Sequence, residues 1–332
     1  MNAPLCYTSL IGQERAKKMI HRMLLGRRLP HALLFRGPAG VGKKLFARGL
    51  AAALNCRGGL PGLACGTCAS CHKLLSGNHP DFLVIQPEKD AIKIDQVRAM
   101  SRATTYPPYE SPYRVIVLED AHAMQAAAAN SLLKTLEEPP PGNVLILTAE
   151  ASREVLPTIV SRCQVVPFSA LSDDQTLAII NRLLPELDAE MARLAARFAA
   201  GSPGRALRVH ENNLLDLLRR LLAALAVGAN SPTEAVLELL PLAEEMAEQK
   251  ENLPLFFELI RTALAAPIFG QCLFASPPGS SPGGFSFREI SARLSCIDTA
   301  LRQLARNCNR ALVCEVLLFH LTSGAFSPTP RP

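Results

Sequence analysis

The stretch that decides the fold runs from residue 33 to residue 43 and reads Leu33-Leu34-Phe35-Arg36-Gly37-Pro38-Ala39-Gly40-Val41-Gly42-Lys43. An apolar run ends at Gly37, the pattern G-x-x-x-x-G-K follows, and a helix-like stretch covers residues 45–54. A strand, a glycine loop and a helix in this order are typical of a phosphate-binding loop, where backbone N–H groups and the helix N-terminus face the phosphates. We therefore predict that Gly37, Gly40, Gly42 and Lys43 bind nucleotide. The simpler alternative is an ordinary turn between a strand and a helix.

The residue after Lys43 departs from this pattern. Phosphate loops place Ser or Thr there, because the hydroxyl binds Mg²⁺. This chain has Lys44, whose ammonium group cannot bind a cation and repels it. We therefore expect at most weak binding of ATP and Mg²⁺ at this site, and little or no intrinsic ATP hydrolysis.

The composition is that of a folded, water-soluble chain. Its 332 residues are 48% hydrophobic and 19% charged, with a formal net charge of +6, which is compatible with nucleic acid nearby but does not argue for it. There is no run of 18 apolar residues and no signal-peptide pattern over residues 1–12. We expect a cytoplasmic protein, in which the ten cysteines are metal ligands or free thiols and not disulfides.

Four of these cysteines form the pattern C-x8-C-x2-C-x2-C: Cys56, Cys65, Cys68 and Cys71. Thiolates at such short spacing suit a tetrahedral Zn²⁺, and glycines within the longer gap allow it to close. We predict one structural zinc ion held by all four side chains. The alternative is a set of unpaired thiols.

Strand and helix patterns alternate up to residue 168, which predicts a parallel α/β sheet. The expected helices include residues 92–103, 121–138 and 152–159. Residues 114–118 form an apolar run that ends in Glu119 and Asp120, as in the Walker B element, so we add both acids to the predicted nucleotide site. From residue 171 the pattern is helical, and from about residue 212 leucine and alanine recur at helical spacing, which predicts a helical bundle. The predicted division is an α/β domain at 1–169 with a zinc module at about 56–71, a helical lid at 170–210, an all-α domain at 211–326 and a disordered tail at 327–332. A glycine- and proline-rich mobile loop is expected at 276–284.

Several motifs occur together and in order: the phosphate loop, the four cysteines, His79-Pro80-Asp81, Leu132-Leu133-Lys134-Thr135-Leu136-Glu137-Glu138-Pro139-Pro140 and Ser161-Arg162-Cys163. Over about residues 8–210 this set resembles the clamp-loader branch of the AAA+ ATPases, and in particular the non-motor subunits of the bacterial DNA polymerase III clamp loader. The resemblance implies an AAA+ domain, a lid and a C-terminal collar domain. It also implies a pentamer with gamma/tau and delta subunits, which loads the sliding clamp onto primed DNA.

The resemblance assigns Arg162 as an arginine finger that enters the ATP site of a neighbouring subunit. Without it, an arginine paired with a nearby acid would be the simpler interpretation. The motor subunits of this family have a hydroxyl residue at position 44, Asp-Glu at 119–120 and a nucleotide-sensing arginine near 201–204. This chain differs at all three places, and Thr148-Ala149-Glu150 makes the family's first sensor threonine doubtful too.

Two competing hypotheses are weighed against a non-motor subunit. One is an active gamma/tau-type ATPase, which Lys44 and the changed sensor segment disfavour. The other is a nucleic-acid-binding zinc protein, which would need a basic helix beside the metal. The cysteine segment and its surroundings offer only Arg57 and Lys73, so this hypothesis is the weakest.

Overall fold

The computed structural model describes residues 5–60, 62–89, 91–150, 155–228, 232–265 and 287–323. These residues divide into two compact units. The first consists of residues 1–192 and 199–205, and the second of residues 193–198 and 206–332. The predicted loop at 276–284 and the predicted tail at 327–332 lie outside the described residues. Among the described residues, none of the helices is both long enough and apolar enough to span a membrane.

A five-stranded parallel sheet forms the centre of the first unit, in the order β2-β3-β4-β1-β5. The strands are β1 (Ala32–Arg36), β2 (Phe82–Ile85), β3 (Arg114–Leu118), β4 (Asn143–Ala149) and β5 (Gln164–Pro167). The middle strands are continuous apolar runs, as expected where helices cover both faces of a parallel sheet. The predicted α/β class is therefore confirmed.

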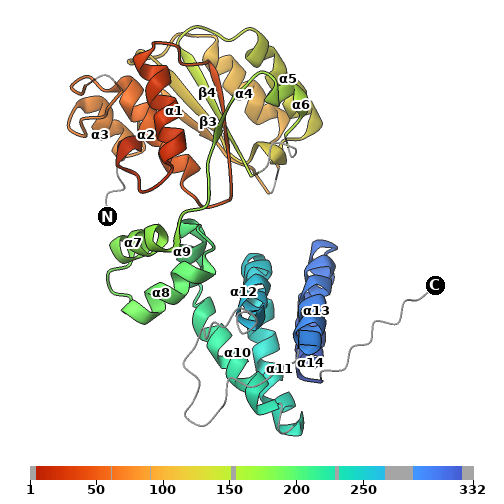
Figure 1. Cartoon of the computed structure of the whole chain (residues 1–332). Coiled ribbons are helices and arrows are strands. Elements are labelled where there is room, and N and C mark those ends of the chain that lie inside the picture. Colours follow the sequence, from red (N-terminus) through yellow and green to blue (C-terminus); the bar gives the residue numbers. More distant parts are fainter. Residues whose placement is uncertain are drawn as a thin grey trace. The chain divides into compact units, whose positions relative to one another are not determined.

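Two apolar cores lie on opposite faces of the sheet. Because side chains alternate along a strand, Leu33 and Phe35 of β1 join one core, while Ala32 and Leu34 join the other. The helices α1 (Glu14–Leu25) and α2 (Lys43–Asn55) cover the first face. The helices α4 (Ile94–Thr104), α5 (Ala126–Glu137) and α6 (Pro157–Val160) cover the second (Figure 1).

The segment after β3 differs from the sequence-based prediction of one helix over 121–138. Asp120 has a left-handed backbone with φ of 49°, and Ala121–Ala123 form only a 3-10 turn. Met124 then pairs with Ile92 in a single β-bridge, so α5 begins at Ala126. The same bridge explains why α4 begins at Ile94 and not at Ile92, because the backbone of Ile92 is extended.

Two further segments differ from the predictions. A helix expected over 152–159 is a single turn, α6, and residues 151–154 lie outside the described residues. The cysteine segment contains a helix that was not predicted, α3 (Ala69–Leu75). The described helices that follow the sheet are α7 (Asp173–Leu183), α8 (Ala189–Phe198) and α9 (Pro203–Glu211).

The second unit contains the helices that the leucine-rich pattern predicted. They are α10 (Leu214–Gly228), α11 (Pro232–Glu248), α12 (Leu253–Ala265), α13 (Phe287–Ala305) and α14 (Arg310–Ser323). Helix α11 packs against α10 and α14, and α13 packs against α12 and α14. Together they bury an apolar interior that includes Phe256, Phe257 and Leu321, so this part of the chain is a helical bundle as predicted.

Candidate functional site

The phosphate loop has the backbone that its glycines predict. Gly40 and Gly42 have positive φ angles of 71° and 97°, which L-residues with a side chain rarely adopt. Helix α2 begins directly after them at Lys43, and the N–H of Gly37 donates to the carbonyl of Ala149 at the end of β4. The loop therefore lies at the carboxyl edge of the sheet with the helix N-terminus behind it, as a phosphate site requires.

The side chain of Lys43 is turned onto its own loop. Its Nζ donates to the carbonyl of Gly37 at 2.6 Å and to the carbonyl of Pro38 at 2.7 Å. The residue is only 8% exposed. Burial lowers the pKa of its ammonium group, while the negative charges of Glu150 and Asp120 oppose that shift. Two of the three donors that could hold a phosphate are thus used inside the loop.

The side chain of Lys44 forms an ion pair with Glu119, one of the two acids of the predicted nucleotide site. Its Nζ lies 2.9 Å from Oε1 of Glu119, and Gln86 donates to the other oxygen, Oε2, at 3.0 Å. Oε1 therefore takes part in an ion pair and Oε2 in a hydrogen bond within the chain.

The two other residues at this edge are Asp120 and Thr148. Asp120 follows Glu119 and is exposed. Its backbone N–H donates to the hydroxyl oxygen of Thr148, at 3.1 Å, near the end of β4. Thr148, which the sequence left doubtful as the family's first sensor, therefore lies beside the two acids.

The segment 201–204 is fastened to the tip of the phosphate loop. The N–H of Gly204 donates to the carbonyl of Gly40, and the hydroxyl of Ser202 donates to the carbonyl of Ala39 at 2.8 Å. A Cβ built on Gly40 would lie 2.3 Å from the Ser202 oxygen, and one on Gly204 would lie 2.9 Å from the Cα of Gly40. Only glycine fits on both sides, so the segment contacts the loop directly through its backbone.

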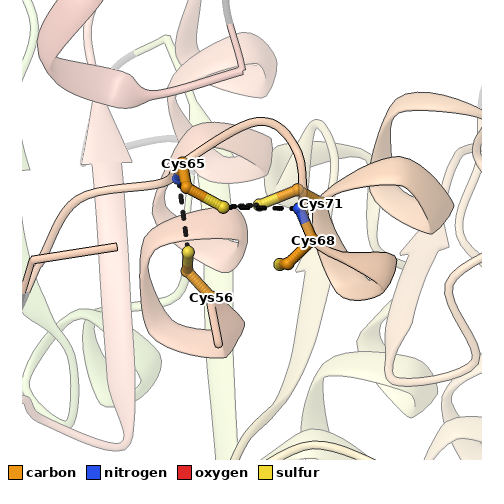
Figure 2. Close-up of side chains that lie close together, drawn as sticks. All are labelled: Cys56, Cys65, Cys68 and Cys71. Carbon is orange, nitrogen blue, oxygen red and sulfur yellow. Dashed lines mark hydrogen bonds between the residues drawn. The ribbon is translucent and has the colours of Figure 1, made fainter. Parts of the chain in front are cut away.

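The four predicted cysteines come together. Their sulfur atoms all lie within 4.8 Å of one another, and the thiols face a common space between the end of α2, the loop after it and α3 (Figure 2). Zn–S bonds of about 2.3 Å would separate tetrahedral sulfurs by roughly 3.8 Å, close to the 4.0 Å between Cys65 and Cys71. The residues therefore fit a tetrahedral metal site with four sulfur ligands.

Backbone donors already point at these sulfurs. The N–H of Cys65 donates to Cys56 Sγ at 3.2 Å, and the N–H of Cys68 donates to Cys65 Sγ at 3.4 Å. Hydrogen bonds, first that from the Thr67 hydroxyl, lower the pKa of the Cys65 thiol to about 5, whereas burial raises the pKa of Cys71 to about 12. Such donors stabilise thiolate, which is the form that binds metal.

A buried polar network beneath this cluster was not predicted. Ser70 of α3 and the ring Nε2 of His79 lie 3.0 Å apart, and His79 Nδ1 accepts from the N–H of Asp81. The fully buried carboxylate of Asp81 accepts from the N–H groups of three consecutive residues: Tyr109, Glu110 and Ser111. Since Nδ1 accepts, Nε2 carries the proton, so His79 positions the segment and is no base toward Ser70.

Within the described part of the chain, the side chain of Arg162 contacts the ends of α5 and α6 and not the phosphate loop. It follows the single turn of α6, and its side chain is 38% exposed. The guanidinium Nη2 lies 2.7 Å from Oε1 of Glu137, and Nη1 donates to the carbonyl of Thr158 at 3.1 Å. Burial raises the pKa of the following thiol, Cys163, to about 12, and this half-buried side chain packs against the second core.

The loop, the two acids after β3 and the sheet order define the first unit as a P-loop domain of the AAA+ class. A family model described as "DNA polymerase III, delta subunit" matches residues 12–172. The DNA polymerase III subunit delta' of Pseudomonas aeruginosa is 36% identical over 232 residues, which are 69% of this chain and 68% of that protein. The chain therefore belongs to the DNA polymerase III delta-prime family.

Other relatives match over a smaller share of their length. The subunit delta' of Bacillus subtilis is 39% identical over 55% of each chain. The gamma/tau subunit of Mycobacterium tuberculosis is 34% identical over 67% of this chain and 38% of its own length. Among solved structures, a gamma subunit-related protein of Thermotoga maritima is 17% identical, with a TM-score of 0.48 over 93% of this chain and 99% of that one.

Proposed function

We propose that this chain is a non-motor subunit of the DNA polymerase III clamp loader, which assists a neighbouring ATP site and does not hydrolyse ATP itself. The observation that carries the proposal is the ion pair between Lys44 and Glu119. A motor subunit needs a hydroxyl at this position to bind Mg²⁺, whereas here a positively charged side chain pairs with Glu119 instead. The inward turn of Lys43 and the contact of residues 202–204 with the loop support the same conclusion.

The proposal includes the partners and the domain roles that the family suggests. Gamma/tau and delta subunits would complete a pentamer that loads the sliding clamp onto primed DNA. In the three-part division, residues 1–169 carry the AAA+ domain, 170–210 the lid and 211–326 the collar, through which the subunits would assemble. Zinc is proposed as the metal at the four cysteines, with a structural role only, because four protein ligands leave no open position.

The contribution of the subunit to its neighbour is proposed to be Arg162. A guanidinium can meet a γ-phosphate through two parallel N–H groups and stays charged throughout hydrolysis. Its partial exposure at the end of α6 is compatible with contact to another chain. A complex reconstituted from this chain with gamma/tau and delta subunits tests the proposal directly. Clamp loading should require the chain, and a complex lacking it should fail to load clamps.

An active motor of the gamma/tau type is the second candidate. The 34% identity to the Mycobacterium tuberculosis gamma/tau subunit is the observation in its favour. It predicts that the isolated chain hydrolyses ATP, which the proposed function does not.

The isolated chain is expected to show ATP turnover at the background rate, with and without Mg²⁺, because Lys44 neutralises Glu119 and repels the metal. Weak Mg²⁺-independent binding of ATP through the loop N–H groups is compatible with this. Titration with labelled ATP and a phosphate-release assay provide the measurement. Robust turnover that disappears in Lys43→Ala would contradict the prediction and favour the motor.

A further inference from the structure

Glu137 occupies an unfavourable position for an acid. It is the last residue of α5, and Glu138 follows as the C-cap. The C-terminus of a helix carries partial negative charge, so an acid there is less favourable than a neutral residue. Such a conflict with the local preference calls for a compensating contact elsewhere.

The compensating contact of Glu137 is the guanidinium of Arg162. Oε1 of Glu137 lies 2.7 Å from Nη2. Nη1 donates to the carbonyl of Thr158 and contacts the hydroxyl of Ser161 at 3.4 Å. The arginine is therefore held from two sides, by the end of α5 and by the turn of α6, and these two helices pack against each other.

These contacts leave Nε of the guanidinium available. Among the residues that the structure describes, Nε has no hydrogen-bond or ion-pair partner. Arginine binds an anion through parallel hydrogen bonds from its planar guanidinium, and Nε is one of the donors of such a fork. The contacts to Glu137 and Thr158 thus orient the guanidinium through Nη2 and Nη1 and leave Nε unengaged.

The geometry points to Glu137 as a positioning residue that orients Arg162 for a neighbour's phosphate. The inference rests on the proposed role of Arg162 as an arginine finger. Glu137 itself would touch neither ATP nor the reacting atoms. An exposed arginine with no partner samples many rotamers, and that freedom must be lost before the side chain can act on a transition state. Glu137 removes part of that freedom in advance, which is preorganisation in the same sense as for a binding loop.

The test uses the full clamp-loader complex and the matched pair Glu137→Gln and Glu138→Gln. Both variants remove one acid at the same helix end. Glu138 is exposed and has no side-chain hydrogen bond or ion pair among the described residues, so its variant is the control. Arg162→Ala and the double variant Glu137→Gln/Arg162→Ala complete a double-mutant cycle.

The readout is the part of the DNA- and clamp-stimulated ATPase that Arg162→Ala removes. We expect Glu137→Gln to lower the kcat of this part by about twofold to fivefold, the range of an exposed ion pair. The KM for ATP should not change, because the finger acts on the transition state and not on ground-state binding. Glu138→Gln should behave like the unchanged protein, and Glu137→Asp should recover part of the loss. The double variant should equal Arg162→Ala alone.

Three results would overturn the inference about Glu137 without contradicting the proposed role of Arg162. Glu137→Gln could match Glu138→Gln, it could raise the Arg162-dependent turnover, or the double variant could fall clearly below Arg162→Ala. If Arg162→Ala itself had no effect, the proposed function of Arg162 would fail and the inference with it. Melting temperatures and assembly by gel filtration, unchanged in all variants, separate these effects from simple misfolding.

Discussion

Replacing Arg162 by alanine is expected to lower ATP hydrolysis at the neighbouring site by a factor on the order of 10³, with clamp loading lost in parallel. The magnitude follows from arginine fingers in GTPases, which contribute 10³–10⁵ to the rate. Charge builds up on the phosphoryl oxygens in the transition state, and the guanidinium stabilises it. The total ATPase of the complex should fall less, because other sites would continue to turn over.

The controls for this variant follow from the surroundings of the side chain. Arg162 is partly exposed, and its pair with Glu137 is a surface contact, so folding and zinc content should not change. Arg162→Lys should recover little, since an ammonium group cannot reproduce the two-pronged contact. Stimulated ATPase and clamp loading provide the measurement. Unchanged rates in Arg162→Ala would make Arg162 a structural ion-pair residue.

Replacing Cys68 by serine is expected to reduce bound zinc from about one per chain to well below one. Zinc binding contributes roughly 10–16 kcal/mol in finger-like peptides, far more than the local contacts of a short glycine-rich loop. The segment 56–71 should therefore lose its fixed structure. The α/β core should keep its fold, because the segment only connects α2 to β2. Both of these elements belong to the first unit, which is built around the sheet.

The matched control for the zinc variant is Cys308→Ser, which changes an exposed thiol outside the cluster. Metal analysis of protein purified without chelator, limited proteolysis and thermal melting provide the measurements. Full zinc content in Cys68→Ser would show that Cys68 is no ligand. Loss of the whole fold would show instead that the module supports the core, through contacts such as that of Ser70 with His79.

Local patterns in the sequence determined most of the fold. The apolar runs before Gly37 and Glu119 predicted buried parallel strands, because a strand covered on both faces needs apolar residues at successive positions. The spacing of the four cysteines predicted their convergence, since ligands with two residues between them can reach one ion. The helical bundle followed from leucines at helical spacing. These predictions depend on residues close together in the chain.

The tertiary structure alone decided where polar side chains find their partners. Lys44 was predicted to repel Mg²⁺, but its ion pair with Glu119 joins residues 75 positions apart along the chain (119 minus 44). The extended stretch before α5 depends on a bridge between Ile92 and Met124, which a helical pattern cannot reveal. The pair of Glu137 with Arg162 likewise joins two helix ends that only folding brings together. Sequence periodicity reports which side of an element is buried, whereas the partner of a charged group depends on distances across the fold.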